Sequence, residues 1–301
     1  MDREGQANFF KACFRSAHLS DPITTSTTSL NRRSFVMSSL IVGFTPAIAY
    51  ADATPIHTDS TGLVAEEVRI PVADGALPGY AARPQGSGPF PIVLVIEEIF
   101  GVHEYIKDVC RRLAHQGYLA VAPELYARIA DLSTMTDPQQ IVRDVISKAP
   151  DATLLSDLDA TAAWAHGQHG DPSRLACLGF CRGGRDSWRY AEHIPNLKAA
   201  IAFYGPVNTS DTPIQPHSPL ERAADLKCPL LGLYGGQDSS IAVADVHAAQ
   251  ARARAAGRDV EIVVYPDAPH GFHADYRPSY RQGPAEDGWK RMMAWLHRYG
   301  V

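Results

Sequence analysis

From residue 63 onward, apolar runs of strand length alternate with amphipathic stretches of helical length. The segments 66–72 and 77–84, joined by ADGA, predict an opening antiparallel hairpin. The later strands are predicted at 90–101, 118–125, 174–180, 198–205, 229–238 and 260–266, and the helices at 103–117, 154–168, from 183, at 242–257 and at 285–300. Near-continuous apolar strands interleaved with helices predict an α/β fold, with a mostly parallel central sheet and helices on both faces.

The composition is that of a soluble globular enzyme, with 45% hydrophobic and 20% charged residues in 301. The net charge is −5, and no basic block follows the first fifty residues, which argues against nucleic acid as a partner. The sequence has no internal repeat and no second core. We therefore expect residues 52–301 to form a single domain.

The first 51 residues differ from the rest and resemble a secretory leader. A Ser/Thr-rich stretch is followed by the arginine pair at 32–33 and by an uncharged run at 34–51 that ends in small residues. This layout predicts a signal peptide of the twin-arginine type, cleaved near residue 50, and hence an exported, periplasmic protein. The alternative is a membrane anchor, but Gly43 and Pro46 interrupt the run, which is shorter than the roughly 20 apolar residues that a span needs.

Four cysteines remain after such a cleavage: Cys110, Cys177, Cys181 and Cys228. Their spacing matches no common zinc motif, so no metal site is expected. A chain of this size can build a core without disulfides, and free thiols are the simplest prediction.

Cys181 directly follows the predicted strand 174–180, within the sequence Gly-Phe-Cys-Arg-Gly-Gly. This is a strand-to-helix elbow of the G-x-nucleophile-x-G type, in which side chains two residues to either side of the nucleophile would collide with the neighbouring strand and helix. The positive end of the following helix favours a thiolate. Cys181 is therefore the candidate nucleophile, whereas Cys177, in mid-strand, is expected to be a buried structural cysteine.

A thiolate needs a proton carrier, and His270 lies in the loop after the last predicted strand. His273 is the rival, ranked second because the sequence Pro-His-Gly-Phe offers a tight turn that presents His270. Asp238, just past the preceding strand, is expected to orient the imidazole, although it could instead cap the next helix. The chain order is then nucleophile, acid, base.

These motifs resemble the dienelactone hydrolase (carboxymethylenebutenolidase) family from about Glu66 to the C terminus. The motifs that carry the resemblance are EEIFGVHEYIKDVCRRLAHQGYLAVAPELYAR, GFCRGG, YGGQD and PHGFHADYR. The resemblance implies an α/β-hydrolase fold and a Cys-His-Asp triad that cleaves lactones or small carboxylic esters through an acyl-thioester, with no cofactor. The expected partner is a small-molecule substrate, and the sequence leaves its identity and the oligomeric state open.

The resemblance also implies roles for residues around the thiol. Glu98 falls on the family position whose carboxylate contacts the resting thiol, and Glu97 is the alternative if the strand register differs. The backbone N–H groups of Arg182 and Ile99 would form the oxyanion hole. Arg277 is a candidate for binding a substrate carboxylate.

In relatives a hydrophobic or aromatic residue often follows the nucleophile, whereas this chain has Arg182 at that position and Arg185 three residues later. The two guanidinium groups could attract a carboxylate-bearing substrate, or could form a solvated helix face.

Two other functions compete with ester hydrolysis. The sequence CRGGRD suggests a cysteine sulfurtransferase or phosphatase, but such loops need an arginine where this chain has Asp186 or Ser187, and an acid would repel the anion. A catalytically inert binding domain of the same fold is the second alternative.

Overall fold

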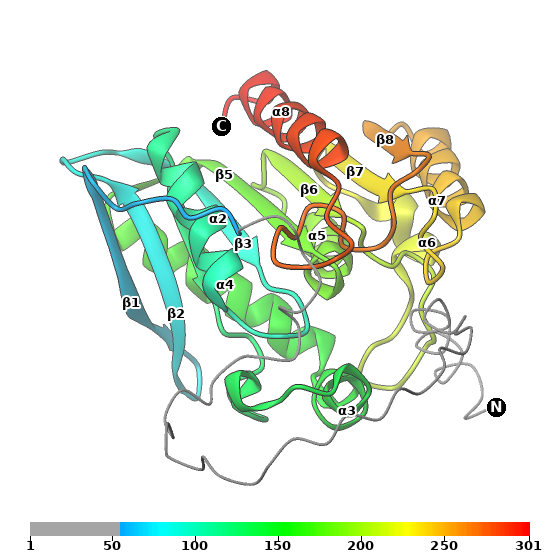
Figure 1. Cartoon of the computed structure of the whole chain (residues 1–301), viewed down its shortest axis with the longest axis horizontal. Coiled ribbons are helices and arrows are strands. Elements are labelled where there is room, and N and C mark those ends of the chain that lie inside the picture. Colours follow the sequence, from blue (N-terminus) through cyan, green and yellow to red (C-terminus); the bar gives the residue numbers. More distant parts are fainter. Residues whose placement is uncertain (1–54) are drawn as a thin grey trace, which may run out of the picture.

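The computed structural model of the chain describes residues 55–301, so the signal peptide predicted for residues 1–51 lies outside the described residues. The chain forms one eight-stranded sheet with the order β1-β2-β4-β3-β5-β6-β7-β8 (Figure 1). The strands are β1 (Leu63–Val72), β2 (Gly75–Pro84), β3 (Phe90–Ile96), β4 (Leu119–Pro123), β5 (Gly170–Phe180), β6 (Ala199–Phe203), β7 (Leu230–Gly235) and β8 (Val260–Tyr265). The hairpin β1–β2 is antiparallel, β2 pairs antiparallel with β4, and all later pairs are parallel.

Helices connect the parallel strands and cover the sheet. They are α2 (Glu104–His115), α3 (Pro138–Asp144), α4 (Asp151–Gly167), α5 (Arg182–His193), α6 (Pro219–Arg222), α7 (Val243–Ala255) and α8 (Gln282–Arg298). Every residue of β4 and β6 is buried, which requires cover on both faces of the sheet. The predicted α/β fold with a mostly parallel sheet is confirmed.

The predicted elements are all present, with ends shifted by a few residues. The largest shift is in β3, which ends at Ile96 because the chain beyond it turns, as the isolated bridge between Glu98 and Gly101 shows. No sequence pattern predicted α3, α6 or the short 3-10 helices η1 (Leu132–Thr134), η2 (Ile146–Lys148) and η3 (Ala223–Asp225). These short elements lie in two connections, between β4 and α4 and between β6 and β7, where no long apolar periodicity marks them.

Two further expectations concern cysteines and membrane spans. Cys110, Cys177, Cys181 and Cys228 are free thiols. Cys177 is fully buried in β5, and that burial raises the pKa of its thiol to about 12. Within residues 55–301, no helix has both the length and the apolar character that a membrane crossing requires.

Candidate active site

Cys181 stands at a sharp bend between β5 and α5. It caps the N terminus of α5 with φ 54° and ψ −118°, a backbone conformation that costs free energy for any residue except glycine. Its N–H donates a hydrogen bond to the Phe203 carbonyl of β6 at 3.0 Å, and its side chain is partly exposed. Strain of this kind, held in place by the neighbouring strand, is typical of a nucleophile elbow.

The glycines around Cys181 allow the close packing on which this bend depends. A Cβ on Gly179 would lie 1.9 Å from the carbonyl oxygen of Gly183, and one on Gly183 would lie 2.3 Å from the carbonyl oxygen of Ile96. The start of α5 is therefore pressed against the end of β3. The crowding predicted from the spacing of the glycines is confirmed.

His270 and Asp238 meet at the same edge of the sheet, past the ends of β8 and β7. Nδ1 of His270 lies 2.7 Å from Oδ2 of Asp238. The other carboxylate oxygen of Asp238 accepts hydrogen bonds from the N–H groups of Ser240 and Ile241. Asp238 thus contacts the imidazole with one oxygen and holds the turn that follows it with the other. Gly271, with φ +73°, makes the tight turn that presents the ring of His270.

The electrostatics of His270 link it to Cys181. Burial alone would lower the pKa of His270, but the Cys181 sulfur and the Asp238 carboxylate outweigh burial and raise this pKa well above its usual value. Burial likewise opposes ionisation of Asp238, yet His270 and Ser240 hold its pKa below the usual value. The three side chains thus favour an imidazolium beside a sulfur and a carboxylate.

His273, the rival histidine, faces elsewhere. Its Nδ1 lies 2.7 Å from the hydroxyl of Tyr105, and its ring stacks near Trp289. Burial, and then the charge of Arg112, lower the pKa of His273 to about 3, so this ring is neutral. The geometry therefore separates the two histidines, and only His270 pairs with Asp238.

Glu98 is fully buried among polar partners from the segment after β8 and from the residue that precedes α2. Its Oε2 accepts a hydrogen bond from the Tyr276 hydroxyl at 2.6 Å and lies 3.6 Å from Nη2 of Arg277 and 3.4 Å from Nε2 of His103. Burial opposes ionisation, but Arg277, His103 and Tyr276 together lower the pKa of Glu98 to about 2. Within the described residues its Oε1 has no hydrogen-bond partner, so contact with the Cys181 thiol stays a prediction.

Glu97 lies apart from this group. Its Oε1 accepts a hydrogen bond from the N–H of Leu125 at 2.8 Å, which ties the end of β3 to the end of β4. Burial and the nearby Glu124 raise the pKa of Glu97 well above its usual value. Of the two glutamates, Glu98 is the one that shares a cluster with Arg277.

Arg182 and Arg185 do not form a solvated helix face. The two residues are 8% and 1% exposed, so of the two alternatives for their guanidinium groups the solvated face is wrong. The Arg182 guanidinium contacts Asp186, Asp151 and the side chain of Gln215. Substrate binding by the Arg182 side chain stays a prediction, but each of the three guanidinium nitrogens already has a partner within the protein.

The two amides expected to form the oxyanion hole lie on the segments packed around Cys181. Arg182 is the first residue of α5, and the first N–H groups of a helix have no partner within it. Ile99 follows Glu98 in the turn after β3. Gly183 of α5 packs against the carbonyls of Ile96 and Glu97, just before that turn. The oxyanion hole formed by these two N–H groups stays a prediction.

Three residues around the site were not predicted from the sequence. Tyr276 and His103 both contact Oε2 of Glu98, and their ring centroids lie 4.9 Å apart. Tyr204 follows β6 with φ 37°, and its ring lies edge-on to His270 at 5.1 Å between ring centroids. The signal for Tyr204 was its position directly after a strand, the same criterion that selected Cys181 and Asp238.

No group of three or more histidine, cysteine, aspartate or glutamate side chains between residues 55 and 301 could hold a metal ion.

Comparisons with known proteins agree on the family. Residues 77–300 match the model of the dienelactone hydrolase family. A protein of Methylorubrum extorquens named "Putative carboxymethylenebutenolidase" is 54% identical over 91% of this chain and 95% of its own length. A protein of Escherichia coli K12 with the same name is 48% identical over 86% of this chain and 96% of its own length.

Solved structures give the same result. The crystal structure titled "Putative Dienelactone Hydrolase" from Klebsiella pneumoniae is 49% identical, with a TM-score of 0.77 over 79% of this chain and 99% of that one. The carboxylesterase EstE1, at 17% identity and a TM-score of 0.61, covers 79% of this chain and 90% of its own and shows the shared α/β-hydrolase fold alone. The chain thus has the α/β-hydrolase fold, acts as a hydrolase on lactones or esters, and belongs to the dienelactone hydrolase family.

Proposed function

We propose that the protein hydrolyses a lactone or small carboxylic ester through Cys181, His270 and Asp238, by way of an acyl-thioester. The observation that carries the proposal is the 2.7 Å contact between His270 and Asp238, beside a cysteine held in a strained bend. Nucleophile, base and orienting acid are the three roles that acyl transfer by a thiol requires.

The proposed reaction has two halves. The Cys181 thiol passes its proton to His270, and the resulting thiolate attacks the ester carbonyl and forms a C–S bond, while the N–H groups of Arg182 and Ile99 hold the negative oxygen. The C–O bond then breaks as His270 gives its proton to the departing alkoxide or enolate oxygen. In the second half, His270 takes a proton from water, the water oxygen attacks the thioester, and the C–S bond breaks to release the acid.

Glu98 is proposed to control the thiol. An anion beside a sulfur disfavours the thiolate, so a carboxylate that contacts the thiol keeps it neutral until it is drawn away. The ion pair with Arg277 and the hydrogen bond from Tyr276 are partners that can draw it away.

The test compares two cysteines on the same strand-to-helix unit. Cys181→Ala is expected to abolish hydrolysis of p-nitrophenyl acetate, whereas Cys177→Ala should keep most of it. Mass spectrometry of the wild-type protein after a short exposure to the ester should show an acyl group on Cys181. Equal activity of the two variants would refute Cys181 as the nucleophile, and an unmodified protein would favour an inert binding domain.

We also propose that residues 1–51 direct export by the twin-arginine route and that residues 52–301 are the mature domain. The support is the arginine pair at 32–33 before an uncharged run. Replacing both Arg32 and Arg33 by lysine should leave the protein in the cytoplasmic fraction of a bacterial host, while the wild type is recovered from the periplasm. Equal distribution of the two proteins would contradict the proposal.

A further inference from the structure

The residue after Cys181 carries a guanidinium group that the proposed reaction does not use. Arg182 forms three contacts, all with buried or half-buried groups: Nε with Asp186 at 3.2 Å, Nη2 with Asp151 at 3.4 Å and Nη1 with Gln215 at 3.1 Å. Its side chain is 9% exposed. A charge at this depth is tolerated only where it is paired and hydrogen-bonded, and here it is.

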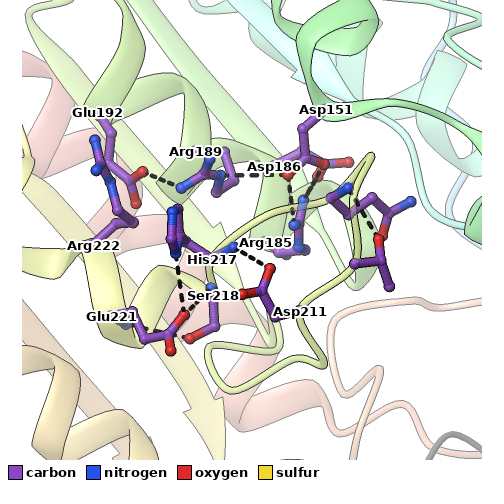
Figure 2. A network of polar contacts seen from close by, with 12 residues as sticks. Asp151, Arg185, Asp186, Arg189, Glu192, Asp211, His217, Ser218, Glu221 and Arg222 are labelled. Atoms are coloured by element: carbon purple, nitrogen blue, oxygen red, sulfur yellow. Dashed lines mark hydrogen bonds and ion pairs between the residues drawn. The ribbon is translucent and has the colours of Figure 1, made fainter. Parts of the chain in front are cut away.

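Arg182 belongs to a row of three arginines along one face of α5. Arg185 binds both oxygens of Asp151 at 2.8 Å and contacts Asp186 at 2.9 Å, and Arg189 lies 3.6 Å from Asp151 (Figure 2). Asp151 is the first residue of α4, so the row fastens α5 to the start of α4. Bidentate arginine–carboxylate contacts of this kind fix orientation as well as adding free energy.

Gln215 connects this row to a third segment, the connection between β6 and α6. The amide nitrogen of Gln215 donates hydrogen bonds to the carbonyls of Ile146 and Ala149, at 2.6 and 2.9 Å, while its oxygen accepts from Arg182. Next to it, the carbonyl of Ile214 accepts a hydrogen bond from the N–H of Asp151 at 2.9 Å. The Arg182 side chain is therefore the point where α5, the start of α4 and this connection meet.

The backbone N–H of Arg182 is one of the two proposed oxyanion donors. It belongs to the peptide bond that joins Arg182 to the strained Cys181. We propose that the Arg182 side chain is a positioning residue, which holds this N–H in the orientation that stabilises the oxyanion. The inference rests on the proposed function. It gives the guanidinium a role inside the protein instead of contact with substrate.

The proposal separates two reactions of Cys181. Acylation by p-nitrophenyl acetate passes through an oxyanion, whereas alkylation by iodoacetamide forms none and depends only on the sulfur and access to it. In Arg182→Met, we expect acylation to slow by about tenfold or more, while alkylation stays within about twofold of wild type. Arg182→Lys, which keeps a charge but not the fork, should recover part of the acylation rate.

Arg189→Met is the matched control. It removes the same group from the same row two turns further from Cys181, and both reactions should stay within about twofold of wild type. If Arg182→Met does not fold by circular dichroism, Gln215→Leu tests the same linkage without leaving a buried charge unpaired. It should slow acylation by about threefold and leave alkylation unchanged.

The outcomes distinguish this inference from the proposed function. If the wild type acylates on Cys181 and Arg182→Met acylates equally fast, or loses both reactions equally, the positioning role is refuted while the proposed function stands. If the wild type is alkylated but gains no acyl group on Cys181, the proposed function fails and this inference fails with it.

Discussion

The hydrogen bond between Asp238 and His270 favours the protonated form of the imidazole. Because the carboxylate stabilises the imidazolium, it contributes to the raised pKa of His270. An imidazolium can protonate a leaving alkoxide, and a neutral ring held in the wrong orientation cannot.

Asp238→Asn is therefore expected to lower kcat/KM for p-nitrophenyl acetate by about 100-fold or more. The pKa of His270 should fall, so the loss of activity at alkaline pH should begin at a lower pH than in wild type. A pH–rate profile measures both effects. An unchanged alkaline limb would show that Asp238 does not control this proton.

The effect of Glu98 on the ionisation of the Cys181 thiol follows from the negative charge of its carboxylate. With a pKa of about 2, the Glu98 carboxylate is negative at every pH where the thiol titrates. Glu98→Gln removes that anion and leaves Arg277 without its acidic partner, and both changes favour a thiolate.

We expect the pH profile of iodoacetamide alkylation to move to lower pH in Glu98→Gln. Glu97→Gln is the comparison, since Glu97 bonds to Leu125 and not to this cluster. A profile for Glu98→Gln that coincides with wild type would remove Glu98 from the control of the thiol.

At the scale of elements, the site depends on how closely α5 approaches the neighbouring strands. Because Gly183 has no side chain, the first turn of α5 packs against the carbonyls of Ile96, the last residue of β3, and of Glu97. A Cβ on Gly183 would lie 2.3 Å from the first oxygen and 2.5 Å from the second. Both obstacles are backbone atoms, which cannot rotate away. One interface thus sets the distance between the two proposed oxyanion donors.

Gly183→Ala should therefore separate α5 from β3. We expect a loss of about 1–3 kcal/mol in the free energy of unfolding and a loss of ester hydrolysis of about tenfold or more. Gly283→Ala in α8 is the control, since a Cβ there meets no atom within 4 Å. Its stability, measured by urea unfolding, should stay within about 0.5 kcal/mol of wild type.

At the scale of the whole molecule, a buried network of ion pairs between the arginines of α5 and Asp151 joins α5 to the start of α4. Asp151, 4% exposed, lies within 3.6 Å of Arg182, Arg185 and Arg189. Removing one partner of a buried ion pair leaves the other charges without compensation, which costs far more than the pair contributes. The stability of the molecule should therefore be sensitive to this one carboxylate.

Asp151→Ala is expected to lower the free energy of unfolding by about 3–5 kcal/mol. Asp144→Ala, which breaks the exposed pair with Arg143, should change it by no more than about 1 kcal/mol. Urea unfolding of the two variants measures the difference. Similar values for both would show that the buried row is not coupled to global stability.

The sequence by itself determined the order of strands and helices along the chain, the bend at Cys181 and the candidates His270 and Asp238. These depend on local properties: the period of apolar residues, glycines at fixed offsets, and the position of a residue just after a strand. The tertiary structure decided the partners of each side chain. Tyr276 meets Glu98 across 178 residues of sequence, and Arg182 meets Asp151 across 31, so no local pattern could show either contact. From the sequence, a charged side chain next to the nucleophile looks the same whether it faces solvent, substrate or a buried carboxylate. Its burial depends on which distant segments pack against it.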